Sequence, residues 1–174
     1  LVSRGMTNVE GDFLDHVRLD LNPNNADEYA TPDGWRRFTI RNETIVVKGD
    51  RDRVVEIKET LWGPVAEKPL MGHPVALRWI ALDPDAVDLG LMQMDQARTV
   101  RDAIAVANRA GGPPNNVVLA DADGHIAWTF MGKIPVRRGF DGSVSVSWAD
   151  GRTGWNGFIA PDELPRIVDP PSGY

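Results

Sequence analysis

Hydrophobic and polar positions alternate along residues 33–65 of the chain. A period of two is typical of strands, whose successive side chains point to opposite faces. Breaks at Asn42 and at Gly49-Asp50 divide the stretch, so we expect three antiparallel strands joined by two tight turns, with one face in water. The apolar positions of the expected strands are Trp35, Phe38, Ile40, Ile45, Val47, Val55 and Ile57.

A further strand is predicted within residues 72–84, and residues 85–95 have a short, mixed pattern that resembles a helix. The clearest helix lies within residues 97–112, where Val100, Ala103, Ile104 and Ala107 recur at helical spacing. Thr99 is its expected N-cap, with Asp102 in the first turn, and Gly111 suits its end. Because the apolar face is made largely of alanine, this helix is expected to pack closely on a sheet.

Residues 115–136 predict a hairpin around the turn Asp123-Gly124. Its first strand is apolar on both faces from Val117 to Ala120, so we expect cover on both sides. The residues after the hairpin are rich in Gly, Pro, Ser and Asp and predict a long irregular excursion anchored by Trp148, Trp155 and Phe158.

Composition narrows the function classes. The chain has 174 residues, enough for one domain or a piece of a larger one, and a net charge of -6, which argues against a nucleic-acid partner. Without cysteine it has no thiolate chemistry and no disulfide, and no apolar run is long enough to span a membrane. Residues 1–12 lack an initiator Met and a signal pattern, so both ends are expected to be cut from a longer protein.

Local chemistry alone gives no complete catalytic group. His16, His73 and His125 lack the spacing of zinc ligands, and Ser143, Ser145 and Ser147 have no predicted base nearby. Glu10, Asp12 and Asp15 are oxygen ligands of the kind that calcium takes, although such acidic clusters are usually solvated turns.

The six tryptophans could stack on a sugar or peptide, which would make the chain a binding module. Trp35, Trp79 and Trp128 lie in predicted strands and are expected to be buried. The ones expected to be more exposed are Trp62, Trp148 and Trp155.

Several segments, in order along the chain, resemble the penicillin acylase family of N-terminal nucleophile hydrolases. They are GMTNVEGDFLDHVRLDLNP, ETIVVKG with LWGPV, NNVVLADADGHIAWTFMGKIPVRR, and GWNGFIAPDELPRIVDPPSGY. The third is the most specific, because it is similar to the family pattern N-W-x-x-A-D-x-x-G-x-I-x-Y-x-x-x-G-x-x-P-x-R.

The resemblance implies an α+β fold, mostly antiparallel sheet with few helices, as part of a four-layer αββα arrangement. It also implies an internal fragment of the large subunit, with residues 1–32 as the oxyanion and acidic-loop segment and 33–83 as a β-rich segment. Residues 84–112 would be a helical segment, and 113–174 the core hairpin and excursion.

The implied activity is hydrolysis of an amide bond in an N-acyl compound, penicillin-like or another acylated amine, through an acyl-enzyme. The family's N-terminal serine and oxyanion asparagine would lie outside these residues, so we expect the chain alone to be inactive. Its expected partners are the small subunit and the remainder of the large subunit, or a second copy covering its open strands. The family keywords are antibiotic biosynthesis and calcium, and the implied location is periplasmic or secreted.

Carried over position by position, the family's oxyanion main-chain donor falls on Asn8. The acyl pocket falls on Leu91, Met92 and Asn115, and Met92 with Met94 would suit a flexible apolar acyl group. A calcium loop would comprise Asp12, Leu14, Asp15 and Gly142, with further ligands outside the chain.

Overall fold

The computed structural model describes residues 1–173, and they divide into two compact units. The first unit comprises Leu1–Phe13, Ile80–Val136 and the residues from Asn156 on, and the second comprises Leu14–Trp79 and Arg137–Trp155. Both units thus draw on separate stretches of the chain. The four segments expected from the sequence are blocks along the chain, and they stay a prediction.

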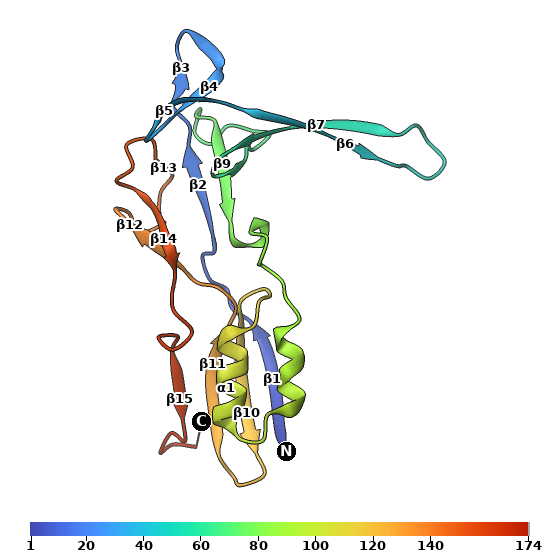
Figure 1. Cartoon of the computed structure of the whole chain (residues 1–174), viewed down its shortest axis with the longest axis vertical. Coiled ribbons are helices and arrows are strands. Elements are labelled where there is room, and N and C mark those ends of the chain that lie inside the picture. The colour runs from blue at the N-terminus through green and yellow to red at the C-terminus, as the bar shows by residue number, and fades with distance from the viewer. Residues whose placement is uncertain (174) are drawn as a thin grey trace. The chain divides into compact units, whose positions relative to one another are not determined.

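The first unit is built on a four-stranded antiparallel sheet in the order β1-β10-β11-β15 (Figure 1). These strands are β1 (Val2–Asn8), β10 (Asn115–Asp121), β11 (Ile126–Met131) and β15 (Arg166–Val168). The hairpin β10–β11 turns at Asp123 and Gly124, whose φ of +90° is a conformation that glycine adopts without strain, so this prediction is confirmed.

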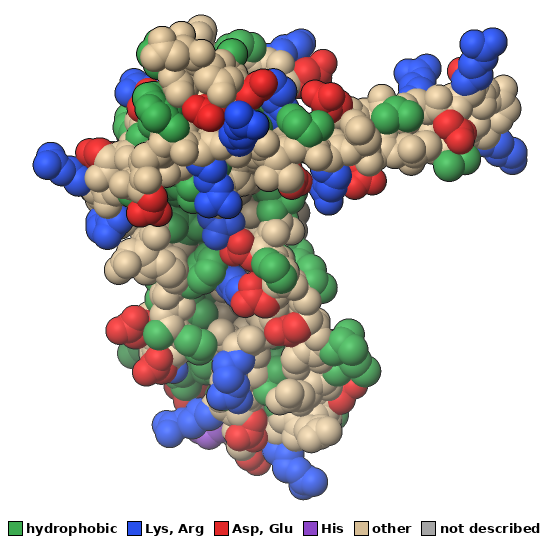
Figure 2. Space-filling model, turned by 45° about the horizontal axis from the view of Figure 1, so that its top comes forward, with side chains coloured by type: hydrophobic (Ala, Val, Ile, Leu, Met, Phe, Trp, Pro, Cys, Tyr) green, Lys and Arg blue, Asp and Glu red, His purple; other side chains and the backbone are tan. Residues whose placement is uncertain are grey.

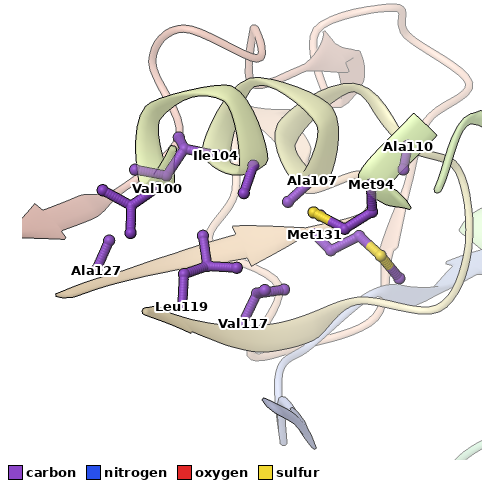
Figure 3. Close-up of a cluster of buried hydrophobic side chains, with 10 residues drawn as sticks. Met94, Val100, Ile104, Ala107, Ala110, Val117, Leu119, Ala127 and Met131 are labelled. Carbon is purple, nitrogen blue, oxygen red and sulfur yellow. The ribbon is translucent and has the colours of Figure 1, made fainter. Parts of the chain in front are cut away.

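Helix α1 (Val100–Arg109) packs on one face of this sheet (Figure 3). The Thr99 side chain accepts from the Asp102 N–H and the Asp102 side chain accepts from the Thr99 N–H, which confirms the predicted cap as a capping box. The helix contributes Val100, Ala103, Ile104 and Ala107 to a buried cluster with Val117 and Leu119 of β10 and Ala127 and Met131 of β11. Its small alanine side chains let the helix lie close to the strands.

Two short 3-10 helices, η1 (Ile80–Leu82) and η2 (Gly90–Gln96), precede α1. The second of them is the segment for which the sequence suggested a short helix. None of the helices within residues 1–173 is long and apolar enough to cross a membrane.

The second unit contains short sheets around an aromatic core. The elements are β2 (Leu14–Arg18), β3 (Leu21–Asn22), β4 (Asn25–Thr31), β5 (Gly34–Arg37), β6 (Thr39–Ile45), β7 (Arg53–Thr60), β8 (Gly63–Pro64), β9 (Val75–Trp79) and β13 (Val146–Ser147). They pair in the orders β13-β2-β9, β3-β4-β5 and β6-β7-β8, and a further sheet pairs β12 (Pro135–Arg138) with β14 (Gly154–Phe158).

The tryptophan prediction is wrong in both directions. Trp62 and Trp148, expected to be more exposed, are 9% and 4% exposed and pack with Tyr29 in the core of the second unit. Trp35 and Trp79, expected to be buried, are 54% and 44% exposed. Strand periodicity identifies which side chains share a face, but burial depends on what packs against that face, and the irregular segments supply the core here.

The prediction that only one face of the strands in residues 33–65 is exposed to water is also wrong for the hairpin of β6 and β7. This hairpin projects away from the rest of its unit (Figure 1). Every residue of β6 is exposed, and on β7 Val54 and Val55 are 67% and 41% exposed. Within residues 1–173 neither face of this hairpin is fully buried, and β8 pairs only with Glu59 and Thr60 at the end of β7. Figure 2 shows acidic, basic and hydrophobic side chains interspersed along it.

Candidate functional site

The predicted oxyanion donor lies where β1 ends. Asn8 is the last residue of β1, and it lies opposite Asn115 of β10, which in turn lies opposite Met131 of β11. Asn8 is exposed and Asn115 is half-buried, with its Nδ2 donating to the carbonyl of Pro113 at 2.7 Å. The structure therefore brings two of the predicted site residues together as cross-strand neighbours.

Asn116 links three strands on the face of the sheet that is turned away from α1. Its Nδ2 donates to the Thr7 hydroxyl at 3.2 Å and to the Asn8 carbonyl at 3.3 Å. Its Oδ1 accepts from the indole N–H of Trp128 at 3.1 Å. Thr7, Asn116 and Phe130 are in register on β1, β10 and β11, so these side chains point to the same side.

The same face carries an open apolar surface. Val118 and Ile167 are each 51% exposed, and with Ile126, Trp128 and Pro170 they line a hollow of about 420 Å³. Leu119, which points to α1, is 3% exposed. The expected cover of β10 on both faces is thus found only on the helix side among the described residues.

The predicted acyl-pocket positions lie in the same unit. Leu91 of η2 packs against the core cluster that contains Met131, the cross-strand neighbour of Asn115. Met92 is 67% exposed, whereas Met94 is buried in that cluster. Met94 is therefore a core residue, and of the two methionines only Met92 is exposed.

The acidic segment contains one deeply buried carboxylate. Asp15 of β2 is 4% exposed, and its Oδ2 accepts from Arg137 Nε at 2.9 Å and from Trp155 Nε1 at 2.5 Å. Its charge is thus balanced by one guanidinium and its oxygen is bonded by two donors from β12 and β14.

These contacts bear on the predicted calcium loop. Asp12 is exposed and belongs to the first unit, whereas Leu14, Asp15 and Gly142 belong to the second. Within residues 1–173 no group of three or more acidic or histidine side chains could hold a metal ion. Because Asp15 Oδ2 already has two protein donors, one of them cationic, the residues of this chain do not fit a calcium site by themselves.

The three serines singled out in the sequence donate hydrogen bonds to nearby oxygen atoms. The hydroxyls of Ser143, Ser145 and Ser147 donate to the Asp141 carboxylate, the His16 carbonyl and the Asp20 carboxylate. None of these three acceptors is a histidine ring.

His125 forms an electrostatic clamp between the β10–β11 turn and the residue after β15. Its Nδ1 lies 2.8 Å from Asp169 Oδ2, and this hydrogen bond and the charges of Asp169 and Asp121 raise the pKa of His125. The pKa of Asp169 is lowered by the hydrogen bond from the Ile126 N–H and then by His125. Both groups are exposed, so the clamp is a surface feature of the fold.

The exposed tryptophans Trp35 and Trp79 lie in different sheets. Trp35 lies on β5 in the sheet β3-β4-β5, and Trp79 lies on β9 in the sheet β13-β2-β9. The binding-module alternative predicted a row of aromatics on one face, and these two residues do not form such a row on a single sheet.

Two residues that matter here were missed in the sequence. Asn116 stands beside the predicted Asn115, but its contact with Asn8 joins positions 108 residues apart, which only the register of β1 and β10 reveals. Arg137 was missed as the partner of Asp15 for the same reason, since 122 residues separate them.

Comparison with known proteins gives a consistent result. The family model described as penicillin amidase matches residues 2–174. The chain is 31% identical over 182 residues to an acyl-homoserine lactone acylase QuiP of Pseudomonas fluorescens, covering 99% of this chain and 22% of that protein. It is 32% identical over 167 residues to the penicillin acylase 2 proenzyme of Pseudomonas sp., covering 91% of this chain and 22% of that protein.

A solved structure agrees with these relatives. The thermostable penicillin G acylase from Alcaligenes faecalis matches with a TM-score of 0.85 and 27% identity, over 99% of this chain and 31% of that chain. This likeness confirms the expected fold class, α+β and mostly antiparallel sheet with few helices. The chain therefore spans about a fifth of the length of the curated relatives it matches.

Proposed function

Because the chain belongs to the penicillin amidase family, we propose that it is part of an amidase that cleaves the bond between an acyl group and an amine. The named relatives are an acyl-homoserine lactone acylase and a penicillin acylase, so the proposed substrate class is an N-acyl compound. In an acyl-enzyme route a nucleophile attacks the amide carbonyl, the amine leaves, and water then releases the acid.

In this proposal the main-chain N–H of Asn8 donates to the oxygen that becomes negatively charged when the carbonyl is attacked. The observation that carries the proposal is the position of Asn8 at the exposed end of β1, opposite Asn115. A fixed donor of this kind contributes roughly 3 kcal/mol to the stability of the transition state. Since the donor belongs to the backbone, the side chain at position 8 is not decisive for the bond.

Leu91, Met92 and Asn115 are the proposed wall of the acyl pocket. Met92 is largely exposed and offers a flexible apolar contact, and the Asn115 amide adds a polar group that a purely aromatic pocket would not contain. We therefore propose an aliphatic acyl chain rather than a phenylacetyl group as the preferred acyl part.

The residues of this chain supply the scaffold and the Asn8 donor, and the proposed nucleophile belongs to the rest of the acylase. The 174-residue chain alone is accordingly proposed not to turn over substrate. A calcium site stays a prediction for the whole acylase, and no step of the proposed reaction depends on it.

The test is to express the complete acylase and to measure amine release from N-acyl homoserine lactones, from a phenylacetyl amide and from a penicillin. The expected result is hydrolysis, with an acyl adduct trapped on the protein in mass spectrometry and faster turnover of aliphatic than of phenylacetyl substrates. An enzyme that hydrolyses none of them would overturn the proposal.

The donor is tested by comparing two replacements at one position. Asn8→Ala keeps the backbone N–H, whereas Asn8→Pro removes it. The proline variant should turn over roughly 100- to 1,000-fold more slowly than the alanine variant. Equal rates in two correctly folded variants would exclude the Asn8 N–H as the donor.

A further inference from the structure

The end of β1 is a place where a main-chain donor would be poorly held by the sheet alone. Asn8 is the last residue of β1 in register with β10, so the regular ladder does not continue past it. Strand ends fray because the next residues add no ladder hydrogen bonds. A donor that has to meet a developing charge needs a position fixed to within about 0.5 Å.

The Asn116 side chain provides the missing restraint. The Asn8 N–H belongs to the peptide that joins Thr7 to Asn8, and the Asn8 carbonyl belongs to the next peptide. Asn116 Nδ2 donates to the Thr7 hydroxyl at 3.2 Å on one side of that N–H and to the Asn8 carbonyl at 3.3 Å on the other. The two bonds restrict rotation about the backbone of Asn8.

The amide of Asn116 is itself oriented by Trp128. The indole N–H donates to Asn116 Oδ1 at 3.1 Å, which leaves Nδ2 to face β1. The Trp128 ring packs edge-on against Phe130, with their centroids 4.9 Å apart. The chain of contacts thus runs from a packed aromatic pair through Asn116 to Asn8.

We infer that Asn116 is a positioning residue for the reaction, which holds the Asn8 N–H in the direction of the oxyanion and is itself oriented by Trp128. This inference rests on the proposed role of Asn8. Asn116 does not touch the reacting atoms in this assignment, and its effect reaches them through the backbone.

The experiment uses the complete acylase. Asn116→Ala removes both hydrogen bonds donated by Nδ2 and the acceptor for Trp128, and the isosteric Asn116→Asp keeps an acceptor for Trp128 but loses the donor to Thr7 and Asn8. Thr7→Val and Trp128→Phe each remove one bond of the network while keeping a side chain of similar shape. Asn24→Ala, an exposed asparagine in the β3–β4 turn, is the matched control.

Two readouts separate positioning from a merely structural role. Each variant is assayed for kcat and KM, and for its affinity for two inhibitors that carry the acyl chain. One is a boronic acid, which forms a tetrahedral adduct, and the other is the alcohol of the same length, which has no carbonyl oxygen.

We expect both Asn116 variants to lose roughly 10- to 100-fold in kcat with KM little changed. Their affinity for the boronic acid should fall by a similar factor, and their affinity for the alcohol should stay unchanged. Thr7→Val and Trp128→Phe should show smaller losses of the same kind, and the Asn24 control none.

Three results would overturn the inference. In the first, the parent enzyme is active and the Asn116 variants fold but keep its kcat and its affinity for the boronic acid. This result would leave the proposed function intact. The second is an equal loss of affinity for both inhibitors together with a raised KM, which would indicate a structural role. The third applies if the Asn116 variants do not fold: unchanged kcat and unchanged affinity for the boronic acid in Thr7→Val and Trp128→Phe would then overturn the inference. A parent enzyme that hydrolyses no amide refutes the proposed function instead.

Discussion

The buried pair of Asp15 and Arg137 should dominate the stability of the strands that it joins. The Asp15 side chain is 4% exposed and the Arg137 side chain 16%, with 2.9 Å between Oδ2 and Nε. Removing Arg137 takes away the cation that contacts the buried carboxylate, whereas removing the Asp15 charge leaves a guanidinium that is nearer to water. The two single substitutions should therefore differ in their cost.

We expect Arg137→Met to lower the free energy of unfolding by about 3 kcal/mol, as for other buried pairs that lose one partner. Asp15→Asn keeps an acceptor for the Trp155 indole and should cost only about 1 to 2 kcal/mol. The double variant should cost less than the sum, with a coupling energy of about 1.5 to 3 kcal/mol.

The assay is urea unfolding followed by tryptophan fluorescence, with the exposed Arg36→Met as the control for loss of a surface arginine. The control should stay within about 0.5 kcal/mol of the parent. A cost below about 1 kcal/mol for Arg137→Met, or strictly additive costs in the double variant, would refute the assignment of a coupled buried pair.

Three further outcomes are expected. Because the pKa of His125 is raised from 6.5 and that of Asp169 is lowered from 3.8, their clamp stabilises fully between these values. The stabilisation is lost as pH rises through the pKa of His125 in the folded protein, or falls through the pKa of Asp169 in the folded protein. His125→Gln should therefore flatten the pH dependence of the melting temperature, and an unchanged pH profile would contradict this expectation. In Gly139→Ala the new Cβ would lie 2.6 Å from the Arg152 carbonyl oxygen, whereas in Gly49→Ala, at a similar positive φ, it would meet nothing within 4 Å. Gly139→Ala should therefore lower the free energy of unfolding in urea by about 1 to 3 kcal/mol more than Gly49→Ala. Equal losses would show that the structure around Gly139 relaxes. Added calcium should leave the melting temperature of this chain unchanged, and a clear rise would reveal a site that Asp15 does not preclude.

Local signals predicted the parts of the fold that local physics decides. The Thr99 cap, the face of α1 and the Asp123-Gly124 turn depend on residues within a few positions of one another, and each is confirmed. The tryptophans show the limit, because burial of Trp62 and Trp148 depends on segments far apart in the sequence. The contacts of Asn116 could not be predicted from local sequence either, because the register of β1 and β10 determines them.

The hairpin of β6 and β7 has a consequence for handling the protein in solution. Only Glu59 and Thr60 of β7 pair with β8, so within the described residues most of the outer edges of both strands carry unpaired peptide groups. Such edges recruit strands of neighbouring molecules and begin aggregation. Arg41, which contacts Glu43 at 3.4 Å and Glu59 at 3.1 Å, places charge on this ribbon, and charges on edge strands disfavour such self-association.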